Sequence, residues 1–162
     1  MGKQGIMDYL NLKAFISSEG AQLCKGPVAL LFIEDDVEVE STLDHHINLG
    51  FKKVVVFAKS LPEIDEDTLT EVTTVDHNTF DDDVVERTVN ILMPHLAGAW
   101  VYVGYNAEYL FFPFSSTRSI SELVAFHTEE RRGSMLTYVV DLYARDLTTD
   151  PTGVNVDDAC LD

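Results

Sequence analysis

The stretch PVALLFIE, from Pro27 to Glu34, decides the fold because it contains no polar residue before its final acid. A run this short and this uninterrupted favours a strand that is buried on both faces, as strands in parallel sheets are. KKVVVFA, at Lys52–Ala58, is a second run of the same kind. Between the two, residues 36–50 (DVEVESTLDHHINLG) repeat apolar side chains every four residues and end on a glycine, which predicts a helix. The repeated residues are Val39, Leu43 and Ile47.

The same alternation continues along the rest of the chain. Residues 81–98 (DDDVVERTVNILMPHLAG) predict an amphipathic helix with acids at its start, where the helix dipole favours them. Ser119 and Glu122 form a capping box ahead of a third helix at 120–132 (ISELVAFHTEERR). Three further strands are predicted, the first of them weakly, at 70–76 (TEVTTVD), 99–105 (AWVYVGY) and Ser134–Ala144 (SMLTYVVDLYA).

This order of elements predicts the fold class and the organisation of the chain. Strands that alternate with helices imply an α/β protein with a mostly parallel sheet and right-handed crossovers. We expect a Rossmann-like three-layer sandwich in which the strand at 28–34 is central. Residues 1–27 form a lead-in, a short helix or strand; residues 28–145 form the α/β domain; and residues 146–162 form a polar, acidic tail.

Composition excludes some classes of partner. The chain has 162 residues and a formal net charge of −17, which repels nucleic-acid phosphates and anionic membranes. No apolar stretch approaches the roughly 18 residues that are needed to cross a bilayer. Its two cysteines, Cys24 and Cys160, form no CxxC pair, and free thiols in a reducing compartment are the simplest account. We therefore expect a cytoplasmic protein.

Ligands of open α/β sheets bind beyond the carboxyl ends of the strands, so the residues just after each strand are the first site candidates. They are Glu34, Asp35 and Asp36; Ala58, Lys59 and Ser60; Asp76, His77 and Asn78; and Tyr105 to Glu108. Lys59 can bind a phosphate as a point charge. The acids at 34–36 have a purely structural alternative, the capping of the helix that follows. Asp141 is a second-tier candidate, because a carboxylate inside a predicted buried strand must be paired or line a cleft.

Several well-known site types are missing from the sequence. It contains no GxxxxGK[ST], no GxGxxG after a strand and no GxSxG. The acids after the first strand are typical of response-regulator receiver domains, but a receiver needs a lysine after its last strand, and no lysine follows Lys59. His45 and His46 are adjacent on a predicted helix, about 100° apart, so they cannot face one metal. We expect one of them to be half-buried and the other solvated.

Three segments resemble glycosyltransferases of family 2, which have the GT-A fold. EDDVEVESTLDHHINLGFKKVVVF (34–57) is similar to their opening, in which an acidic pair ends the first strand and a helix closes on a His-His and a Leu-Gly-Phe. WVYVGYNAEYLFFPF (100–114) falls where such proteins have their metal-binding DxD motif. SISELVAFHTEERRGSMLTYVVDLYA (119–144) resembles the helix and strand that follow. The resemblance covers roughly residues 28–145 and implies a GT-A-like nucleotide-sugar-binding half.

Carried over residue by residue, the resemblance puts the two DxD carboxylates on Tyr105 and Ala107, neither of which binds a hard cation. Glu108 remains as a metal-ligand candidate, with Asn106 as a carbonyl ligand, so we expect Mn²⁺ or Mg²⁺ to bind weakly. The nucleotide-sugar contacts implied are Glu34 or Asp35 near the base and ribose, Glu108 near the diphosphate, and Lys59. In this family the acceptor half follows, so the chain is either truncated or a reduced descendant.

Two functions follow from the sequence. The first is a glycosyltransferase, in which an acceptor hydroxyl attacks the anomeric carbon of a nucleotide sugar and a base takes its proton. The alternative is a binding or assembly module that keeps the fold without the reaction, as the lost DxD acids suggest. Aromatic residues then form mainly core, or a surface for homo-oligomer contacts. They are Trp100, Tyr102, Tyr105, Tyr109, Phe111, Phe112 and Phe114.

Overall fold

The computed structural model describes residues 7–151 and 160–161. By its internal contacts the chain divides into two compact units, Met1–Phe126 and His127–Asp162. The first unit contains the parallel sheet and the second contains a short two-stranded pairing.

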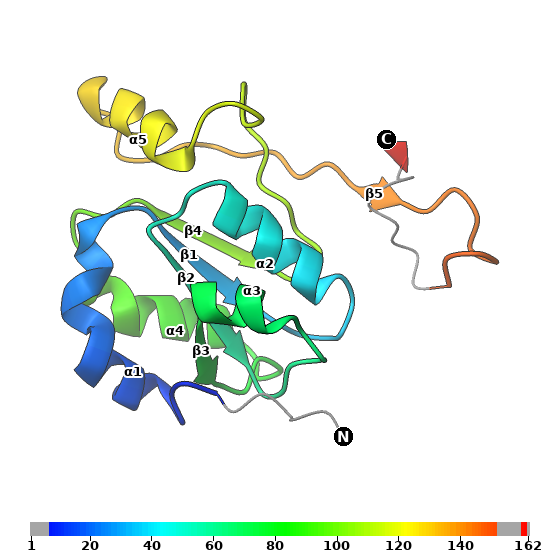
Figure 1. Cartoon of the computed structure of the whole chain (residues 1–162). Coiled ribbons are helices and arrows are strands. Elements are labelled where there is room, and N and C mark those ends of the chain that lie inside the picture. Colours follow the sequence, from blue (N-terminus) through cyan, green and yellow to red (C-terminus); the bar gives the residue numbers. More distant parts are fainter. Residues whose placement is uncertain (1–6, 152–159, 162) are drawn as a thin grey trace. The chain divides into compact units, whose positions relative to one another are not determined.

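The sheet of the first unit has four strands, all parallel, in the order β3-β2-β1-β4 (Figure 1). Their bounds are β1 Val28–Phe32, β2 Lys53–Ala58, β3 Thr73–Asp76 and β4 Val101–Tyr105. The predicted α/β class is confirmed, and so is the central position of the first strand, because β1 pairs with β2 on one side and β4 on the other. The order steps outward from β1 in both directions, which creates the switch point at which Rossmann-like sheets bind ligands.

Helices cover both faces of this sheet, as predicted for a three-layer sandwich (Figure 1). Alternate residues of β1 enter two separate cores: Leu30 and Phe32 pack towards α1 and α4, and Ala29 and Leu31 pack towards α2 and α3. Every residue of β1 is buried, which explains its unbroken apolar sequence. The helices are α1 Leu12–Glu19, α2 Val39–Asn48, α3 Glu66–Glu71, α4 Val84–Leu92 and α5 Ile120–Glu129, with short 3₁₀ turns at η1 Gly20–Lys25 and η2 Met93–His95.

The lead-in segment belongs to the fold of the first unit. It contains α1, whose Phe15 is fully buried, and it also protects the outer edge of β3. The Tyr9 N–H donates to the Thr74 carbonyl at 3.0 Å, and the Asp76 N–H donates to the Tyr9 carbonyl at 2.8 Å. The Asp8 carboxylate accepts from the Thr74 N–H at 2.8 Å. An edge that is paired in this way no longer offers a free ladder to other chains.

Several element boundaries differ from those predicted, and two of them have a clear physical reason. The third strand begins at Thr73 and not at residue 70, because the preceding residues form the short helix α3. This helix has only six residues and little apolar periodicity, so the sequence gives no clear signal for it. The helix predicted at 81–98 is α4, which ends at Leu92 and continues as the turn η2; this turn contains Pro94, which is expected to end or bend the helix near its last turn. Proline cannot donate the hydrogen bond that would extend an α-helix.

The predicted fifth strand at Ser134–Ala144 is wrong. Residues 134–141 have no regular structure, and only Leu142–Tyr143 (β5) form a strand, which pairs antiparallel with Cys160–Leu161 (β6). The apolar side chains of the segment predicted as a strand are largely exposed: the exposed fraction is 83% for Leu136 and 86% for Val139. A run of β-forming residues can be buried only if a neighbouring strand accepts it. Asp141 is consequently an exposed residue outside any strand, and the argument from a buried carboxylate does not apply to it.

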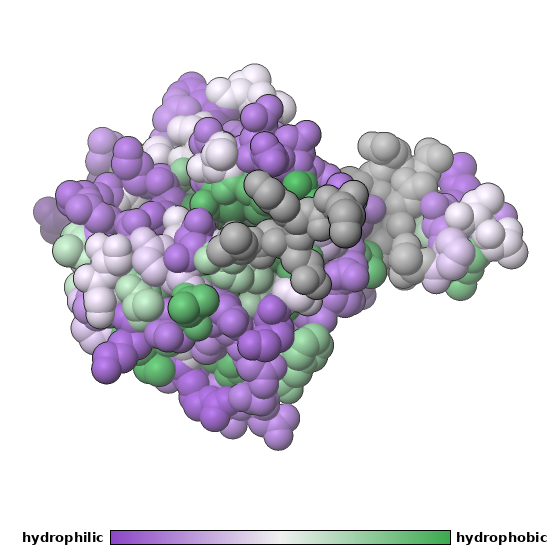
Figure 2. Space-filling model, turned by 60° about the horizontal axis from the view of Figure 1, so that its bottom comes forward, coloured by the Kyte–Doolittle hydropathy of each residue, from purple (hydrophilic) through white to green (hydrophobic). Residues whose placement is uncertain are grey.

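The surface agrees with the strongly acidic composition. Most of the face drawn in Figure 2 is hydrophilic, with smaller hydrophobic areas among the polar residues.

The interpretation of the aromatic residues at 100–114 as mainly core is wrong: Phe111 and Phe114 are exposed, and the other five are half-buried. These rings border the core and do not fill it. Among the described residues, no helix has the length and hydropathy that a membrane span requires.

Candidate functional site

The carboxyl ends of β1 and β4 meet at one edge of the sheet. Phe32 of β1 lies beside Tyr105 of β4 in the parallel register, so the chain segments that follow both residues leave the sheet together. The strand order reverses between these two strands, since β2 and β3 lie on one side of β1 and β4 lies on the other. Glu34, Asp35 and residues 106–108 therefore lie at the switch point of the sheet, where an open α/β fold binds its ligands.

Asn106 joins the two strand ends through its side-chain amide. Its Oδ1 accepts from the Glu34 N–H at 2.9 Å, and its Nδ2 donates to Asp35 Oδ1 at 2.6 Å and to the Val37 carbonyl at 3.0 Å. Its own backbone N–H donates to the Phe32 carbonyl at 3.3 Å. The amide thus bridges the β1–α2 loop and the β4–α5 loop. We call this set of contacts the Asn106 bracket.

Asp35 has a structural role within the bracket. Its Oδ1 accepts from the Val37 N–H at 2.8 Å as well as from Asn106, which closes a tight turn ahead of α2. The helix-capping interpretation is thus partly right: the carboxylate orders the turn, but the N-cap residue of α2 is Glu38, whose backbone is left-handed with φ 51°. Asp36 is exposed beside this turn.

Glu108 is turned back towards β4. One carboxylate oxygen accepts from the Tyr105 N–H at 2.9 Å, and the side chain as a whole is exposed. Between the two residues, Ala107 adopts φ 59°, a left-handed conformation that non-glycine residues rarely take. Arg118 does not pair with Glu108; it forms an ion pair with Glu122 at 2.8 Å. Glu108 therefore stays at the same edge as Glu34 and Asp35.

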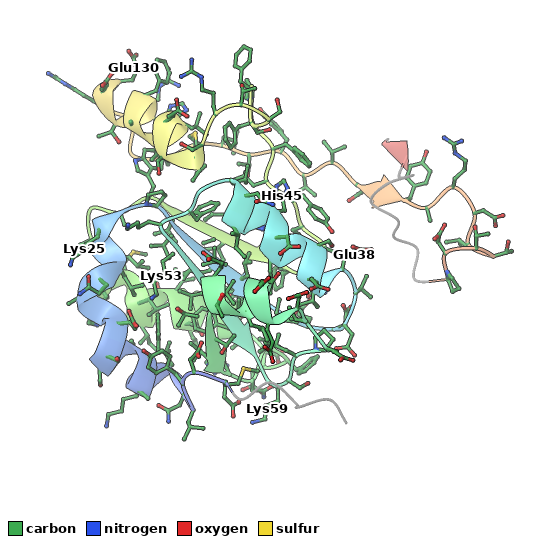
Figure 3. All side chains as sticks on the ribbon, viewed as in Figure 1. Lys25, Glu38, His45, Lys53, Lys59 and Glu130 are labelled. Atoms are coloured by element: carbon green, nitrogen blue, oxygen red, sulfur yellow. The ribbon has the colours of Figure 1, made fainter. Side chains whose placement is uncertain are left out.

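A polar stripe along one face of α2, formed by Glu38, Ser41, Thr42 and His45, holds the loop after β4, and it was not predicted from the sequence. The Ala107 N–H donates to Thr42 Oγ1 at 2.9 Å, and the Leu110 carbonyl accepts from His45 Nε2 at 2.8 Å. Tyr109 Oη lies 2.8 Å from Ser41 Oγ, which also hydrogen-bonds the Glu38 carboxylate. The spacing of the stripe, at i, i+3, i+4 and i+7 on one helix face, is the signal that could have revealed it. Figure 3 labels the two ends of this stripe: His45 on α2, and Glu38, the N-cap residue just before the helix.

The adjacent histidines have different environments from those expected. His46 is fully buried and His45 is half-buried, so neither is solvated. The His46 ring lies 5.0 Å from Tyr102, nearly parallel to it, and its Nδ1 donates to the Thr42 carbonyl at 2.8 Å. Burial lowers the pKa of His46 to about 4 and outweighs the opposing effect of that hydrogen bond. Its Nε2 is buried without a hydrogen-bond partner in the described part of the chain.

Three carboxylates lie near enough to Tyr105, at the end of β4, to act electrostatically on its phenol. Burial, and then the negative charges of Glu34, Glu86 and Glu108, raise the pKa of the phenol. Glu86 belongs to the first turn of α4, so three separate elements contribute carboxylates to this edge. The ring itself packs against Phe32, with centroids 6.4 Å apart. An aromatic surface and several hydrogen-bond acceptors are thus available in one place.

Lys59 lies apart from the Asn106 bracket. It follows β2, and its Nζ forms an ion pair with Asp76 of β3 at 3.0 Å. The side chain is 63% exposed, and Figure 3 shows it well away from Glu38. An approaching phosphate would compete with Asp76 for this amine. Of the predicted site residues, the structure brings together Glu34, Asp35, Asn106 and Glu108 but not Lys59.

The residues at this edge fit a resident metal ion poorly. The Asn106 amide oxygen already accepts a backbone N–H, as does one oxygen of Glu108. In residues 7–151 and 160–161, no group of three or more His, Cys, Asp or Glu side chains is arranged to hold a metal ion. Metal binding by Glu108 stays a prediction.

An open acidic groove lies between α2 and the segment that contains α3. It is lined by Glu40, Glu63, Ile64, Asp65, Glu66 and Asp67. The Glu40 carboxylate accepts from the Asp65 N–H at 2.8 Å, and Asp44 accepts from the Thr68 hydroxyl at 2.7 Å. These contacts tie α2 to α3, so part of the acidity of the groove serves the packing of the two helices.

Comparison of the chain with protein-family models, curated proteins and solved structures found no match in any of the three.

Proposed function

We propose that this chain is the nucleotide-sugar-binding part of a glycosyltransferase-like protein. The observation that carries the proposal is the Asn106 bracket, which fixes the loops after β1 and β4 at the switch point of a parallel sheet. Glu34 and Glu108 stand at this edge beside the Tyr105 ring. Carboxylates accept hydrogen bonds from sugar hydroxyl groups, and aromatic rings pack against the faces of flat ligands.

The role proposed for Glu34 is to accept hydrogen bonds from the ribose of the ligand. Because the side chain is exposed directly after β1, it can reach a ligand without rearrangement of the core. The same carboxylate repels phosphate, so the diphosphate of a nucleotide sugar would lie further from it than the ribose does. Removal of the Glu34 charge therefore has two possible effects on affinity. Affinity falls if the carboxylate accepts hydrogen bonds from the ligand, and it rises if the carboxylate only repels the phosphates.

The test is a binding titration of the full chain with a panel of uridine- and guanosine-diphospho-sugars, with and without added manganese. We expect Glu34→Gln to weaken binding severalfold, since glutamine keeps only one acceptor oxygen, which is neutral, and its amide nitrogen can only donate. Glu71→Gln is the matched control, because Glu71 is an exposed acid at the opposite edge of the sheet, just before β3 begins. Tighter binding by Glu34→Gln would mean that the carboxylate only repels the ligand, and absence of binding by the unaltered chain would overturn the proposal.

The alternative, a binding or assembly module without catalysis, is favoured by one specific observation. The positions that correspond to the DxD acids are Tyr105 and Ala107, and the amide of Asn106 and one oxygen of Glu108 are engaged with the protein itself. A glycosyltransferase predicts both binding and turnover of a nucleotide sugar, a binding module predicts binding without turnover, and an assembly module predicts neither. Hydrolysis or transfer of a bound nucleotide sugar, measured by release of nucleoside diphosphate, separates them.

A further inference from the structure

The connection between β3 and α4 crosses the carboxyl ends of the neighbouring strands. The His77 N–H donates to the carbonyl of Ala58, the last residue of β2, at 2.9 Å. Two residues later, the buried Thr79 hydroxyl donates to the Ile33 carbonyl, just beyond β1, at 2.7 Å. The loop therefore leaves β3, passes β2 and ends against β1. Ile33 immediately precedes Glu34, so the loop reaches the candidate site.

The residue that follows this anchor is Phe80, whose ring is 70% exposed. The turn that presents it is ordered by Asn78: its Oδ1 accepts from the Phe80 N–H at 3.3 Å, and its Nδ2 donates to Asp81 Oδ1 at 2.7 Å. Exposure of a large apolar ring to water is unfavourable. A single exposed ring is common on protein surfaces, but this one stands in a polar loop that is anchored on the ligand-binding edge.

At this edge of the sheet, more hydrogen-bond acceptors than donors are available to a ligand. The backbone N–H groups of Glu34, Val37, Tyr105 and Ala107 are all bonded to protein side chains. Those amides are therefore closed to a phosphate in this conformation. The acceptors are more open, because the exposed carboxylates of Glu34, Glu86 and Glu108 exceed the donors that the protein supplies to them. A ligand that suits this edge brings a flat ring and hydroxyl donors, without a phosphate placed against these acids.

We propose that Phe80 is the stacking platform for the nucleobase of the ligand, and that the uncharged nucleoside portion is what this edge recognises. The inference rests on the proposed function, which it refines by naming the part of the nucleotide sugar that binds here. Stacking on one side chain does not distinguish bases by hydrogen bonding, so all four bases should bind in proportion to their stacking strength.

The experiment titrates the full chain with the neutral nucleosides uridine, cytidine, adenosine and guanosine at millimolar concentration, followed by saturation-transfer NMR. Loss of one base–aromatic stack should reduce affinity by about tenfold, so we expect this reduction in Phe80→Ala. Phe80→Trp should bind at least as tightly, and its indole fluorescence should be quenched by the bound base. Phe126→Ala is the control, because it also removes an exposed phenylalanine ring (55% exposed) but from α5. The first residue of α5, Ile120, is bonded to the Leu49 carbonyl just after α2 ends, and not to the strand ends that form the candidate site.

The outcomes separate this inference from the proposed function. Equal nucleoside affinity of Phe80→Ala and the unaltered chain, with the fold intact by circular dichroism, overturns the platform. If the unaltered chain binds no nucleoside, the claim that this edge recognises the uncharged nucleoside portion is wrong. If nucleotide sugars bind the unaltered chain and Phe80→Ala equally well, the proposed function stands and this inference fails. If neither class of ligand binds, both fail.

Discussion

Lowering the pH should destabilise the protein through His46, because its imidazole is buried in the neutral form. The pKa of His46 is lowered to about 4 by burial, against an ordinary value of 6.5 in the unfolded chain. Between these two values the unfolded state binds the proton more readily than the folded state does. The free energy of unfolding therefore rises with pH across this window, and it falls as the pH drops from about 6.5 towards about 4.

The size of the effect follows from the two pKa values. Relative to neutral pH, the loss is about 2 kcal/mol at pH 5 and about 3 kcal/mol at pH 4, since one pKa unit corresponds to about 1.4 kcal/mol. Burial also lowers the pKa of His77, so His46 is not the only imidazole that makes stability depend on pH. The pH dependence must therefore be compared between the native chain and a His46→Leu variant, which removes only the one titration.

Urea denaturation at a series of pH values measures this difference. We expect the unfolding free energy of His46→Leu to vary less with pH below 6.5 than that of the native chain, whatever the offset between them at neutral pH. His45→Leu, the same change one residue earlier on α2, should keep most of the pH dependence because His46 is still present. Parallel curves for His46→Leu and the native chain, or an NMR titration of the His46 ring near 6.5, would refute the reasoning.

Three further predictions concern the packing around the site. Thr42→Val should lower the unfolding free energy by about 1–3 kcal/mol, since the buried hydroxyl bonds both the Glu38 carbonyl and the Ala107 N–H; urea denaturation should show the loss and Thr42→Ser should restore most of it. Phe57→Ala should cost roughly 3–5 kcal/mol and Trp100→Ala clearly less, because Phe57 is fully buried and Trp100 half-buried; equal shifts in melting temperature would contradict this ranking. Lys59→Met should change the unfolding free energy by less than about 1 kcal/mol, as expected for an exposed ion pair, and a larger change in urea denaturation would count against it.

The sheet could be predicted because a strand buried on both faces leaves a continuous apolar run in its own sequence. Residues of β1 and β2 carry that signal without help from any other part of the chain. The segment Ser134–Ala144 carries a similar signal, but its burial depends on a neighbouring strand that sequence alone does not supply. Helix α3 was missed for the opposite reason: it is held by contacts such as that of Thr68 with Asp44, which have no periodicity to detect.

The positions of the site residues were predictable, but their bonds were not. Parallel pairing of β1 with β4 places Glu34, Asp35, Asn106 and Glu108 at one edge, and this follows from the order of the strands. The side-chain oxygen of Asn106 could bind a metal or accept a hydrogen bond from the Glu34 N–H. Which of the two occurs depends on side-chain geometry across two loops. That geometry is set in turn by the polar stripe on α2. Each stripe residue has an ordinary place in an amphipathic helix, so none is conspicuous in the sequence.

The net charge of the protein and the hydrogen bonding at this edge both disfavour a phosphate group there. A protein with a net charge of −17 can hold a phosphate only through local donors or a bound cation. The backbone N–H groups of Glu34, Val37, Tyr105 and Ala107 around the Asn106 bracket are used within the protein. The nearest predicted cation, Lys59, is paired with Asp76. A nucleotide sugar bound here would thus gain its affinity from its uncharged parts, while its diphosphate would have to extend away from Glu34 and Glu108. The positions that the glycosyltransferase resemblance pairs with the DxD acids hold Tyr105 and Ala107, and a site that recognises the nucleoside has less need of a metal ion to hold the diphosphate.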